Sequence, residues 1–594
     1  MIYDLEAPPG TNPILIPGSQ GFIIGVNWAN NNRLLVTVNL NKVKGSVGSY
    51  NYIDKKHAYY RTVSYDVRGQ NAALLFSNVE EFDRNAVASS IADITLDDPD
   101  HVYMPLLAEY SPGVFHLALY NVDVNTGTAT RFMLGSYTTK TFYMDGKGHV
   151  VARIDQEKQP LVDHLFLNDS GNWRETGQYD AEGLESAGVA GLTADGSALV
   201  RESVHKDTGR TGLVKMLLAD GTVTPLYFDQ KYDVSGEQVD PWTNRIIGYS
   251  IDADMSEDHY FDPKMQALQE GLEAAFPGNS VHAYTWDVDK QEVIVQVDGP
   301  NQPSDYFLLN RATHQAIEIG TTYPGLNDDA LGKISPYPYK ARDGLDIPAY
   351  LTLPPGKPAK NLPTVIMPHG GQMARDGMQF DWMAQFLANR GYAVLQPNFR
   401  GSSGYGKKFV EAGFGQWGLK MQDDVTDGVQ KLIADGIADP KRICIVGASY
   451  GGYAALAGAA FTPDLYACAA SWAGVTDLQH FLQTRSNDYG DDSAMIERWS
   501  RFIGDRKTDA DKLDAASPAK NADRIKCPVL LLHGVSDTTV RIDQSEEMND
   551  ALQHAGKKVT FIKFENETHY MHAGDTRVRY LKELEQFLTA NIGN

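Results

Sequence analysis

The pentapeptide Gly447-Ala448-Ser449-Tyr450-Gly451 restricts the fold of this chain more than any other segment. It follows an unbroken apolar run, Ile443–Val446, and it opens an alanine-rich stretch of helical character. A strand that turns directly into a helix at a serine needs small residues two positions before and two positions after that serine. We therefore predict a tight strand–turn–helix in which the Ser449 hydroxyl is exposed and helix N–H groups lie beneath it.

The second half of the chain alternates between strands and helices around that turn. The predicted strands are nearly continuous runs of Val, Ile and Leu, which is typical of a parallel sheet covered on both faces. We predict strands at 349–353, 364–367, 393–397, 443–446, 468–472, 529–533 and 559–564, and helices at 380–389, 423–434, from 450 onward, at 544–554 and near 577–590. This pattern, with the serine turn at its centre, predicts an α/β-hydrolase domain over residues 326–594.

Residues 1–325 show a different sequence pattern, in which short predicted strands are separated by turns rich in Gly, Asp and Asn. A short repeat, made of a strand, a polar turn and a second strand, recurs at intervals of about 45–50 residues, and one interval is twice as long. Its copies begin at Leu119, Phe166, Met216 and Tyr306. Such a period suits a four-stranded propeller blade, so we predict an all-β propeller domain, with a pair of β-sandwiches as the alternative. Residues 263–276 are predicted to form a helix inserted at a blade edge.

Charge and cysteine content exclude several classes of partner. The formal net charge of −23 argues against nucleic acid and against anionic membrane surfaces, since both bind clustered Lys and Arg. No run of about 18 apolar residues is present, so we expect no transmembrane helix. Cys444, Cys468 and Cys527 lie in or beside apolar runs, and we expect buried free thiols rather than disulfides. No Cys and His spacing indicates a metal site, and no cofactor is expected.

A serine hydroxyl needs a general base, and the base needs a carboxylate that orients it. In α/β-hydrolases these partners follow the serine in the order Asp, then His, on loops after later strands. Asp537 follows the apolar run 530–533, and His569 follows the run 559–564. We therefore predict a catalytic triad of Ser449, Asp537 and His569.

Two residues remain as rivals for the triad positions. His572 lies only three residues after His569, so geometry has to decide between the two imidazoles. Asp543 is the rival carboxylate, although we expect it to cap the following helix.

The tetrahedral oxyanion also needs two N–H donors. One is expected from the backbone of Tyr450, and the other from the glycine loop Pro368–Gly371.

Several further motifs point to a family. They are His369-Gly370-Gly371, the segment 398–406 (Asn-Phe-Arg-Gly-Ser-Ser-Gly-Tyr-Gly), Asp423-Asp424-Val425, the segment 442–453 around the serine, His533-Gly534 with Asp537, and His569. With these motifs the hydrolase half resembles the prolyl oligopeptidase family of serine peptidases, nearest its acylaminoacyl-peptidase and dipeptidyl-peptidase-like bacterial branch. The resemblance implies the same triad, and it implies that the Gly371 N–H is the second oxyanion donor. It also implies a seven-bladed propeller, here with an incomplete first blade, that admits only short or unfolded peptides.

The chain departs from the family pattern at four places. Gln372 stands where relatives usually have proline, and Thr539 stands where many carry a substrate-binding arginine. Paired glutamates that would hold a free amino terminus are not evident, since Val79–Phe82 is a poor match. In relatives a strand pair precedes the segment that resembles Ile2–Leu5, whereas this chain begins at that segment, in the middle of a blade. As written, its start is no signal peptide and predicts a cytoplasmic protein; a longer form would be periplasmic.

These observations predict a serine peptidase that cleaves short peptides through an acyl-enzyme, as an exopeptidase or oligopeptidase. A carboxylesterase and a hydrolase of isopeptides or other unusual amides are alternatives, because triad and oxyanion hole serve those bonds as well. A non-catalytic propeller that binds proteins is the alternative from another class. Tyr453, Trp472 and Val475 are predicted either to line the S1 pocket or to belong to the core. Homo-oligomers are compatible with the sequence.

Overall fold

The structure is a computed structural model that describes residue 14 and residues 22–40, 59–80, 90–95, 97–158, 161–180, 187–326, 328–371, 373–491 and 493–593. The segment 2–5, Phe82 and Gln372 lie outside the described residues. The chain forms two compact units. The first comprises Met1–Ser203, Leu213–Leu226 and Val239–Ile247, and the second comprises Val204–Gly212, Tyr227–Gln238 and Gly248–Asn594. The division at residues 325 and 326 stays a prediction.

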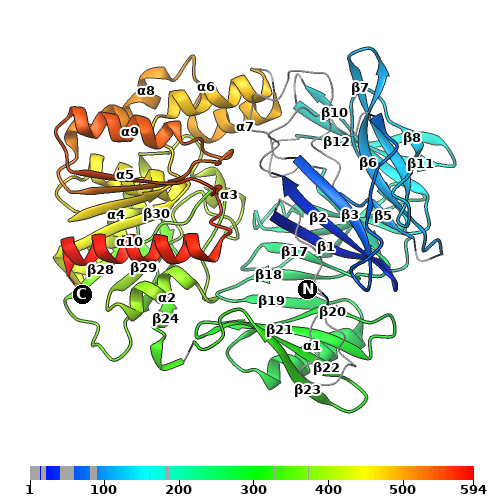
Figure 1. The fold of residues 1–594 in the computed structure, drawn as a ribbon, viewed down its shortest axis with the longest axis horizontal. Helices are drawn as coiled ribbons and strands as arrows, with labels where there is room; N and C mark the ends of the chain where they lie inside the picture. The colour runs from blue at the N-terminus through cyan, green and yellow to red at the C-terminus, as the bar shows by residue number, and fades with distance from the viewer. Residues whose placement is uncertain are drawn as a thin grey trace. The chain divides into compact units, whose positions relative to one another are not determined.

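The first three sheets are antiparallel, and each is built from strands in chain order (Figure 1). The first contains β1 (Phe22–Asn30), β2 (Arg33–Leu40), β3 (Tyr59–Asp66) and β4 (Ala73–Leu74). The second contains β5 (Asp93–Ile94), β6 (His101–Ser111), β7 (Val114–Asp123) and β8 (Ala129–Leu134). The third contains β9 (Thr139–Met144), β10 (Val150–Lys158), β11 (Leu161–Asp169) and β12 (Asn172–Asp180). In the inner strands β6 and β11 alternate residues are buried, as a pleated strand requires when one of its faces packs into a core.

Two further sheets complete the all-β part. One has the order β16-β15-β14-β13-β18-β17, with β19 on β18, and its β13–β18 pair is parallel. Its strands are β13 (Val189–Thr193), β14 (Ala198–Val204), β15 (Thr211–Leu217), β16 (Val223–Tyr227), β17 (Val234–Val239), β18 (Arg245–Asp252) and β19 (Ser256–Tyr260). The other contains β20 (Ser280–Trp286), β21 (Glu292–Gly299), β22 (Gln302–Asn310) and β23 (Gln315–Thr321). The predicted helix forms between them as α1 (Pro263–Ala275), and the Asp262 side chain caps it.

An eight-stranded sheet with the order β24-β27-β29-β28-β30-β31-β32-β33 forms the C-terminal part. The pairs from β28 to β33 are parallel, which confirms the α/β prediction for this half. The strands are β24 (Lys333–Pro336), β27 (Ala349–Leu353), β28 (Leu362–Ile366), β29 (Ala393–Pro397), β30 (Ala438–Ala448), β31 (Cys468–Trp472), β32 (Val529–Gly534) and β33 (Val559–Phe564), with β25 (Tyr339–Lys340) and β26 (Asp346–Ile347) as a separate pair.

Helices cover both faces of this sheet (Figure 1). They are α2 (Trp382–Asn389), α3 (Lys407–Glu411), α4 (Lys420–Ala434), α5 (Tyr450–Phe461), α6 (Leu478–Tyr489), α7 (Ala494–Ile503), α8 (Ala510–Ala515), α9 (Asp543–His554) and α10 (Gly574–Ile592), with 3-10 turns η2 (Asp328–Ala330) and η3 (Pro518–Arg524). Helices α2 and α10 pack on one face, whereas α4, α5 and α9 pack on the other. None of the helices in the described ranges is long and apolar enough to cross a membrane.

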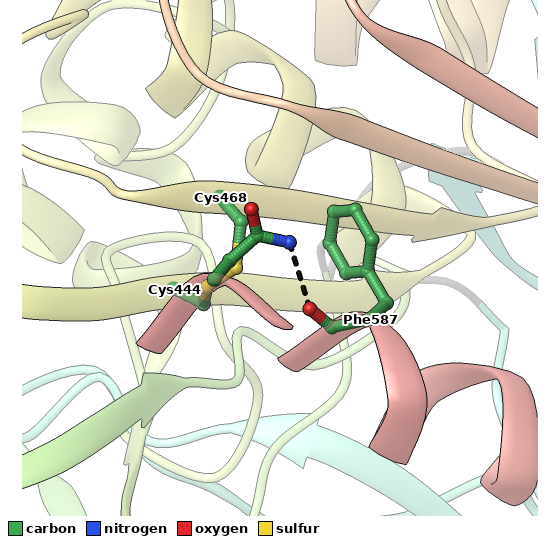
Figure 2. The surroundings of a disulfide bond; sticks show 4 residues. Cys444, Cys468 and Phe587 are labelled. Carbon is green, nitrogen blue, oxygen red and sulfur yellow. Dashed lines mark hydrogen bonds between the residues drawn. A yellow bond between two sulfur atoms is a disulfide. The ribbon is translucent and has the colours of Figure 1, made fainter. Parts of the chain in front are cut away.

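The prediction of three free thiols is wrong for two of the cysteines. Cys444 in β30 and Cys468 in β31 are direct partners in the parallel ladder, with Cα atoms 4.7 Å apart, and a disulfide joins them (Figure 2). Both are buried on the face that α10 covers, and Cys527 is the buried free thiol. The pairing depends on which strands are neighbours and on their register, which cysteine spacing alone does not reveal.

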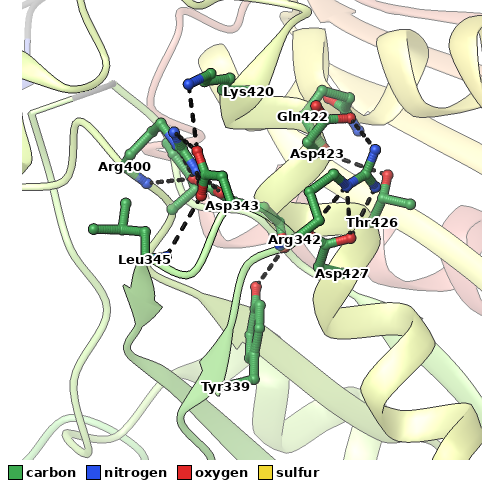
Figure 3. Close-up of polar contacts among 12 residues, drawn as sticks. Tyr339, Arg342, Asp343, Leu345, Arg400, Lys420, Gln422, Asp423, Thr426 and Asp427 are labelled. Carbon is green, nitrogen blue, oxygen red and sulfur yellow. Dashed lines mark hydrogen bonds and ion pairs between the residues drawn. The ribbon is translucent and has the colours of Figure 1, made fainter.

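Two of the family motifs meet in a buried ion-pair network (Figure 3). The Arg400 guanidinium donates to Asp424 at 2.7 and 2.8 Å and to Asp343 at 2.8 and 2.9 Å. Arg400 and Asp424 are 4% and 0% exposed. Arg342 binds Asp427 and Asp423 in the same way, but nearer the surface. These motifs therefore fasten the loop after β29 to helix α4.

The segment between β31 and β32 holds three helices that the sequence analysis did not predict. Asp477 and Ser493 cap the N-termini of α6 and α7 with their side chains, and Gly490 and Gly504 end these helices with φ values of 91° and 133°. These caps were the available signal. The apolar pattern of α6 is short, because the buried stripe of Leu478, Phe481 and Leu482 continues with an arginine, Arg485.

Candidate active site

Ser449 lies in the turn between β30 and α5, as predicted. Its φ and ψ angles are 58° and −120°, a conformation that non-glycine residues rarely adopt. The strained turn is held because the Ser449 N–H donates to the carbonyl of Trp472 on the neighbouring strand at 2.9 Å. Ser449 itself is partly exposed at the C-terminal edge of the parallel strands, the edge where α/β folds bind ligands.

The glycines around the serine are required by close backbone contacts. A Cβ atom on Gly447 would collide with the backbone of Gly451, and a Cβ atom on Gly451 would collide with the carbonyl of Pro368. Larger residues would therefore separate the turn from the glycine loop after β28. On that loop, a Cβ on Gly370 would lie only 3.6 Å from the Ser449 Cβ. The loop predicted to supply an oxyanion donor thus runs alongside the serine.

Asp537 and His569 come together at the same edge of the sheet. The loops after β32 and β33 carry them, and the His569 Nδ1 lies 2.7 Å from the Asp537 Oδ2. The Asp537 side chain is fully buried, and that of His569 is 9% exposed. Within the described ranges, no hydrogen bond joins the Ser449 hydroxyl to the His569 imidazole.

Asp537 accepts hydrogen bonds from backbone and imidazole N–H groups, and such donors stabilise its ionised carboxylate. Its Oδ1 accepts the N–H groups of Thr539 and Val540 at 2.8 and 2.9 Å. Its Oδ2 lies 3.3 Å from the Nε2 of the fully buried His533, which also donates to the Val540 carbonyl at 2.8 Å. Burial acts to raise the pKa of the Asp537 carboxyl, but the hydrogen bonds from His533 and His569 outweigh it and hold the pKa at about 2.

Trp472 connects the serine turn to the histidine loop. Its backbone carbonyl accepts the Ser449 N–H, and its indole N–H donates to the carbonyl of His569 at 2.9 Å. The ring is 1% exposed and packs edge-on against Phe564 and Tyr580. One buried side chain therefore fixes the backbone of His569 relative to the strand that leads past Ser449.

Trp472→Phe is expected to lower kcat by about ten- to a hundredfold, because the His569 loop loses its indole anchor and an imidazole shifted by a fraction of an ångström transfers protons poorly. The free energy of unfolding should fall by about 2 kcal/mol from the smaller ring and the unpaired carbonyl. Trp382→Phe is the matched control, since Trp382 also contacts Tyr580 but neither Ser449 nor His569. It should cost stability without lowering kcat; equal kcat values in both variants would contradict the anchoring role.

The glycine loop after β28 is held by a buried histidine, His369. His369 Nδ1 lies 3.0 Å from the Gly370 carbonyl, its Nε2 lies 2.8 Å from the Ser402 hydroxyl, and its ring stacks on Phe399. Gly371 is exposed with a φ of 55°, a conformation that favours glycine. Tyr450 is the first residue of α5, so its N–H has no acceptor within the helix.

His369 makes the stability of the protein depend on pH. Burial lowers the pKa of its imidazole from 6.5 to about 4. Between these two values the unfolded chain binds more protons than the folded chain, so the free energy of unfolding falls as the pH drops through this window and levels off below pH 4. The expected loss is about 3 kcal/mol. Because other groups such as Asp93 titrate in the same window, the difference between the two proteins is the test: between pH 7 and pH 4, urea unfolding should show the wild type losing about this much more stability than His369→Gln. Identical pH dependence in both would contradict it.

The rivals for the triad positions lie elsewhere. The expectation that Asp543 caps the following helix is wrong: Asp543 is the first residue of α9, no side chain of the described residues caps this helix, and the Asp543 carboxylate is 3.9 Å from His480. The His572 ring lies 5.9 Å from the Tyr570 ring and its backbone N–H donates to Glu567, whereas the imidazole that hydrogen-bonds to Asp537 is that of His569. Tyr453 and Val475 are 0% and 2% exposed in the core, where the Tyr453 hydroxyl donates to the Ala516 carbonyl. Their lining of an S1 pocket, like that of Trp472, stays a prediction.

Sequence reasoning missed how the triad loops are supported. His533 was visible only as part of a motif, and nothing in the sequence indicated that its imidazole would share the Asp537 Oδ2. Glu567 was not singled out, yet its buried carboxylate accepts the N–H groups of Thr568 and His572 and shapes the loop of His569. No group of three His, Cys, Asp or Glu side chains in the described ranges could hold a metal ion.

Known proteins share both the sequence and the fold. The family model for the prolyl oligopeptidase family matches residues 378–594. Dipeptidyl aminopeptidase BIII of Pseudoxanthomonas mexicana is 32% identical over 487 residues, which cover 80% of this chain and 70% of that protein. A puromycin-hydrolyzing peptidase of Mycobacterium tuberculosis has a TM-score of 0.73 at 19% identity, covering 96% of this chain and 94% of that one. Acylaminoacyl peptidase of Pyrococcus horikoshii has a TM-score of 0.66 at 15% identity, covering 97% and 96%.

These similarities and the site agree with one another. The two solved structures share the fold along nearly the whole chain, and the relative from Pseudoxanthomonas carries the sequence similarity beyond the hydrolase half. The serine turn and the buried Asp–His pair lie on loops of the C-terminal sheet among the residues that the family model matches, and the glycine loop lies just before them. The chain belongs to the prolyl oligopeptidase family and is a serine peptidase.

Proposed function

We propose that this peptidase removes short fragments from the amino-terminal end of small peptides, with Ser449 as nucleophile, His569 as general base and Asp537 as the orienting carboxylate. The observation that carries the assignment is the buried hydrogen bond of 2.7 Å between His569 and Asp537, on loops that share the edge of the sheet with the Ser449 turn. Trp472 supports it, because it hydrogen-bonds to the backbones of both Ser449 and His569.

In the proposed reaction, the His569 Nε2 takes the proton of the Ser449 hydroxyl as its oxygen forms a bond to the substrate carbonyl carbon. The same imidazole then gives that proton to the leaving amine as the C–N bond breaks, which leaves an acyl ester on Ser449. Water attacks this ester with His569 again as base, and the acid product and the free hydroxyl are released. Asp537 stays ionised throughout, consistent with its pKa of about 2.

The negative oxygen of each tetrahedral intermediate is assigned to the N–H groups of Tyr450 and Gly371. Support comes from the position of Tyr450 at the N-terminus of α5 and from the contact of Gly370 with Ser449. Donors fixed before the reaction stabilise this charge without reorganisation, which is commonly the largest catalytic contribution in acyl transfer.

The choice of amino-terminal fragments is supported by the Pseudoxanthomonas relative, whose name describes a dipeptidyl aminopeptidase and whose similarity extends over 80% of this chain. We further propose that the all-β part is a propeller of seven blades, the first incomplete, which limits access to short peptides. Its support is the series of antiparallel sheets, most of them four-stranded and in chain order.

A fluorophosphonate probe and a substrate panel test the proposed function. The probe should label Ser449, and labelling should disappear in Ser449→Ala. The panel contains dipeptidyl amides, N-acetylated dipeptidyl amides and p-nitrophenyl esters of the same acyl groups. Hydrolysis of the free dipeptidyl amides at the highest kcat/KM is expected. A clear preference for blocked peptides, or activity on the esters alone, would overturn the proposed substrate class.

A further inference from the structure

Arg485 is a buried cation without a counter-ion. Its side chain is 6% exposed, and it occupies a position on α6 that continues the buried stripe of Leu478, Phe481 and Leu482. Of its three nitrogens only Nη2 donates, to the carbonyls of Thr538, at 3.3 Å, and Thr539. Its Nε is buried without an acceptor. Among the described residues no carboxylate lies within ion-pair distance of it.

The other buried arginines in the described ranges are compensated. Arg400, which is 4% exposed, binds two carboxylates. Arg201, which is 5% exposed, donates from two nitrogens to a carbonyl and a hydroxyl, and it lies 4.1 Å from the centre of the Tyr179 ring. A buried charge without a counter-ion lowers the stability of the folded protein. We infer that the contacts of Arg485 with two carbonyls and one ring do not offset this loss.

The acids around Arg485 have other partners. Asp488, on the same helix, pairs with Arg541. Asp477, which caps the helix, binds Lys520 at 2.7 Å, and Asp491 just beyond it pairs with Arg506 at 3.6 Å. These acids thus neutralise the charges of Arg541, Lys520 and Arg506, whereas the charge of Arg485 has no carboxylate partner among the described residues.

The guanidinium lies beside the loop that carries Asp537. Thr538 and Thr539 directly follow Asp537, and the Thr539 N–H donates to that carboxylate, so Arg485 contacts the turn that holds the triad acid. On the other side it lies 5.3 Å from the centre of the Phe481 ring. From Phe481 a series of ring contacts runs through Trp499 and Trp417 to Tyr450, the residue after Ser449.

We propose that Arg485 binds a carboxylate of the peptide substrate and thereby makes the enzyme selective for acidic peptides. This inference rests on the proposed function, since it concerns the same site. A carboxylate accepts hydrogen bonds from the guanidinium nitrogens that lack acceptors, and the low exposure of Arg485 strengthens such a pair. The carboxylate comes either from an acidic side chain in the acyl part or from the free C-terminus.

Matched substrate pairs on the wild-type enzyme separate these two sources. One set of fluorogenic dipeptidyl amides carries Glu or Gln at the first or the second position, and a set of tripeptides has a free or an amidated C-terminus. We expect kcat/KM to be about 10- to 100-fold higher for the carboxylate member of one pair, the size of a charged hydrogen bond in a buried site. A wild-type enzyme that prefers no carboxylate in any pair would overturn the proposal.

The variants Arg485→Met and Arg485→Lys connect that preference to this residue. Arg485→Met should abolish it while the neutral member keeps its kcat/KM within about threefold, and Arg485→Lys should retain part of it. An equal loss for both members of the pair would mean that Arg485 only supports the Asp537 turn, and would overturn the proposal. Should Arg485→Met fail to fold, the wild-type series and Arg485→Lys decide.

Thermal unfolding adds an independent control. Removing an uncompensated cation should leave the Tm of Arg485→Met unchanged or higher, whereas Arg400→Met should lower the Tm by several degrees, because it leaves two carboxylates unpaired. A Tm loss as large as that of Arg400→Met would contradict the absence of a partner. Fluorophosphonate labelling in every preparation distinguishes a failure of selectivity, with labelling intact, from a failure of the proposed function, in which labelling and turnover are both absent.

Discussion

Ser449→Ala is expected to lower kcat on a dipeptidyl amide by about 10⁴- to 10⁶-fold, because the oxygen that attacks the carbonyl is removed while the rest of the site remains. KM should change little, since the groups that contact the ground-state peptide are untouched. The residual rate reflects substrate binding and oxyanion stabilisation alone. Single-turnover and steady-state kinetics with the same substrate measure the loss, and circular dichroism checks that the fold is retained.

Ser335→Ala provides the matched control, since Ser335 lies on the edge strand β24, away from the Ser449 turn. Its kcat and its fluorophosphonate labelling should equal those of the wild type. Turnover in Ser449→Ala within a factor of about ten of the wild type would show that another residue attacks the substrate.

Asp537→Asn is expected to lower kcat by about 10⁴-fold through the tautomer of His569. The Oδ1 side of Asp537 faces the fixed N–H groups of Thr539 and Val540, so the amide oxygen of an asparagine has to stay on that side. The amide N–H₂ then faces His569 and His533. In the wild type these two imidazoles face the Oδ2 atom, which accepts hydrogen bonds, and the N–H₂ group that replaces it only donates them. His569 has to present an unprotonated Nδ1, which places its proton on Nε2, and in that form it does not accept the proton of Ser449.

Asp543→Asn is the control for this prediction, because the rival carboxylate begins α9 and has no contact with His569. Its kcat should remain within about twofold of the wild type. If instead Asp543→Asn were the inactive variant and Asp537→Asn the active one, the acid of the triad would have been misassigned. The pH dependence of kcat/KM of each active variant shows whether the same imidazole titrates.

The strands and most helices of the catalytic half follow from local pattern alone. Continuous Val and Ile runs place β28 to β33, and the pentapeptide 447–451 places Ser449 in the turn between β30 and α5. At α2 a cap explains the shifted boundary: the helix begins at Trp382 rather than 380, because the Asp381 side chain accepts the N–H groups of Met383 and Ala384. Element type is thus encoded within a few residues of each position.

The features that were not predictable depend on which elements become neighbours. The Cys444–Cys468 disulfide requires β30 beside β31 in one particular register. The contact of Trp472 with His569 joins residues that are 97 positions apart. Helix α6 was missed because its apolar stripe ends in Arg485, a residue that interrupts the pattern used to recognise a buried helix face. Long-range contacts of this kind leave no trace in local periodicity.

The placement of α6, α7 and α8 in the single connection between β31 and β32 separates two tasks of the enzyme. The groups assigned to bond cleavage lie on the loops after β28, β30, β32 and β33, which the sheet and its core hold in place. Arg485 belongs to a segment whose replacement would leave the order of the strands intact. New cleavage preferences can therefore arise by exchanging one crossover segment, without rebuilding the machinery that breaks the peptide bond.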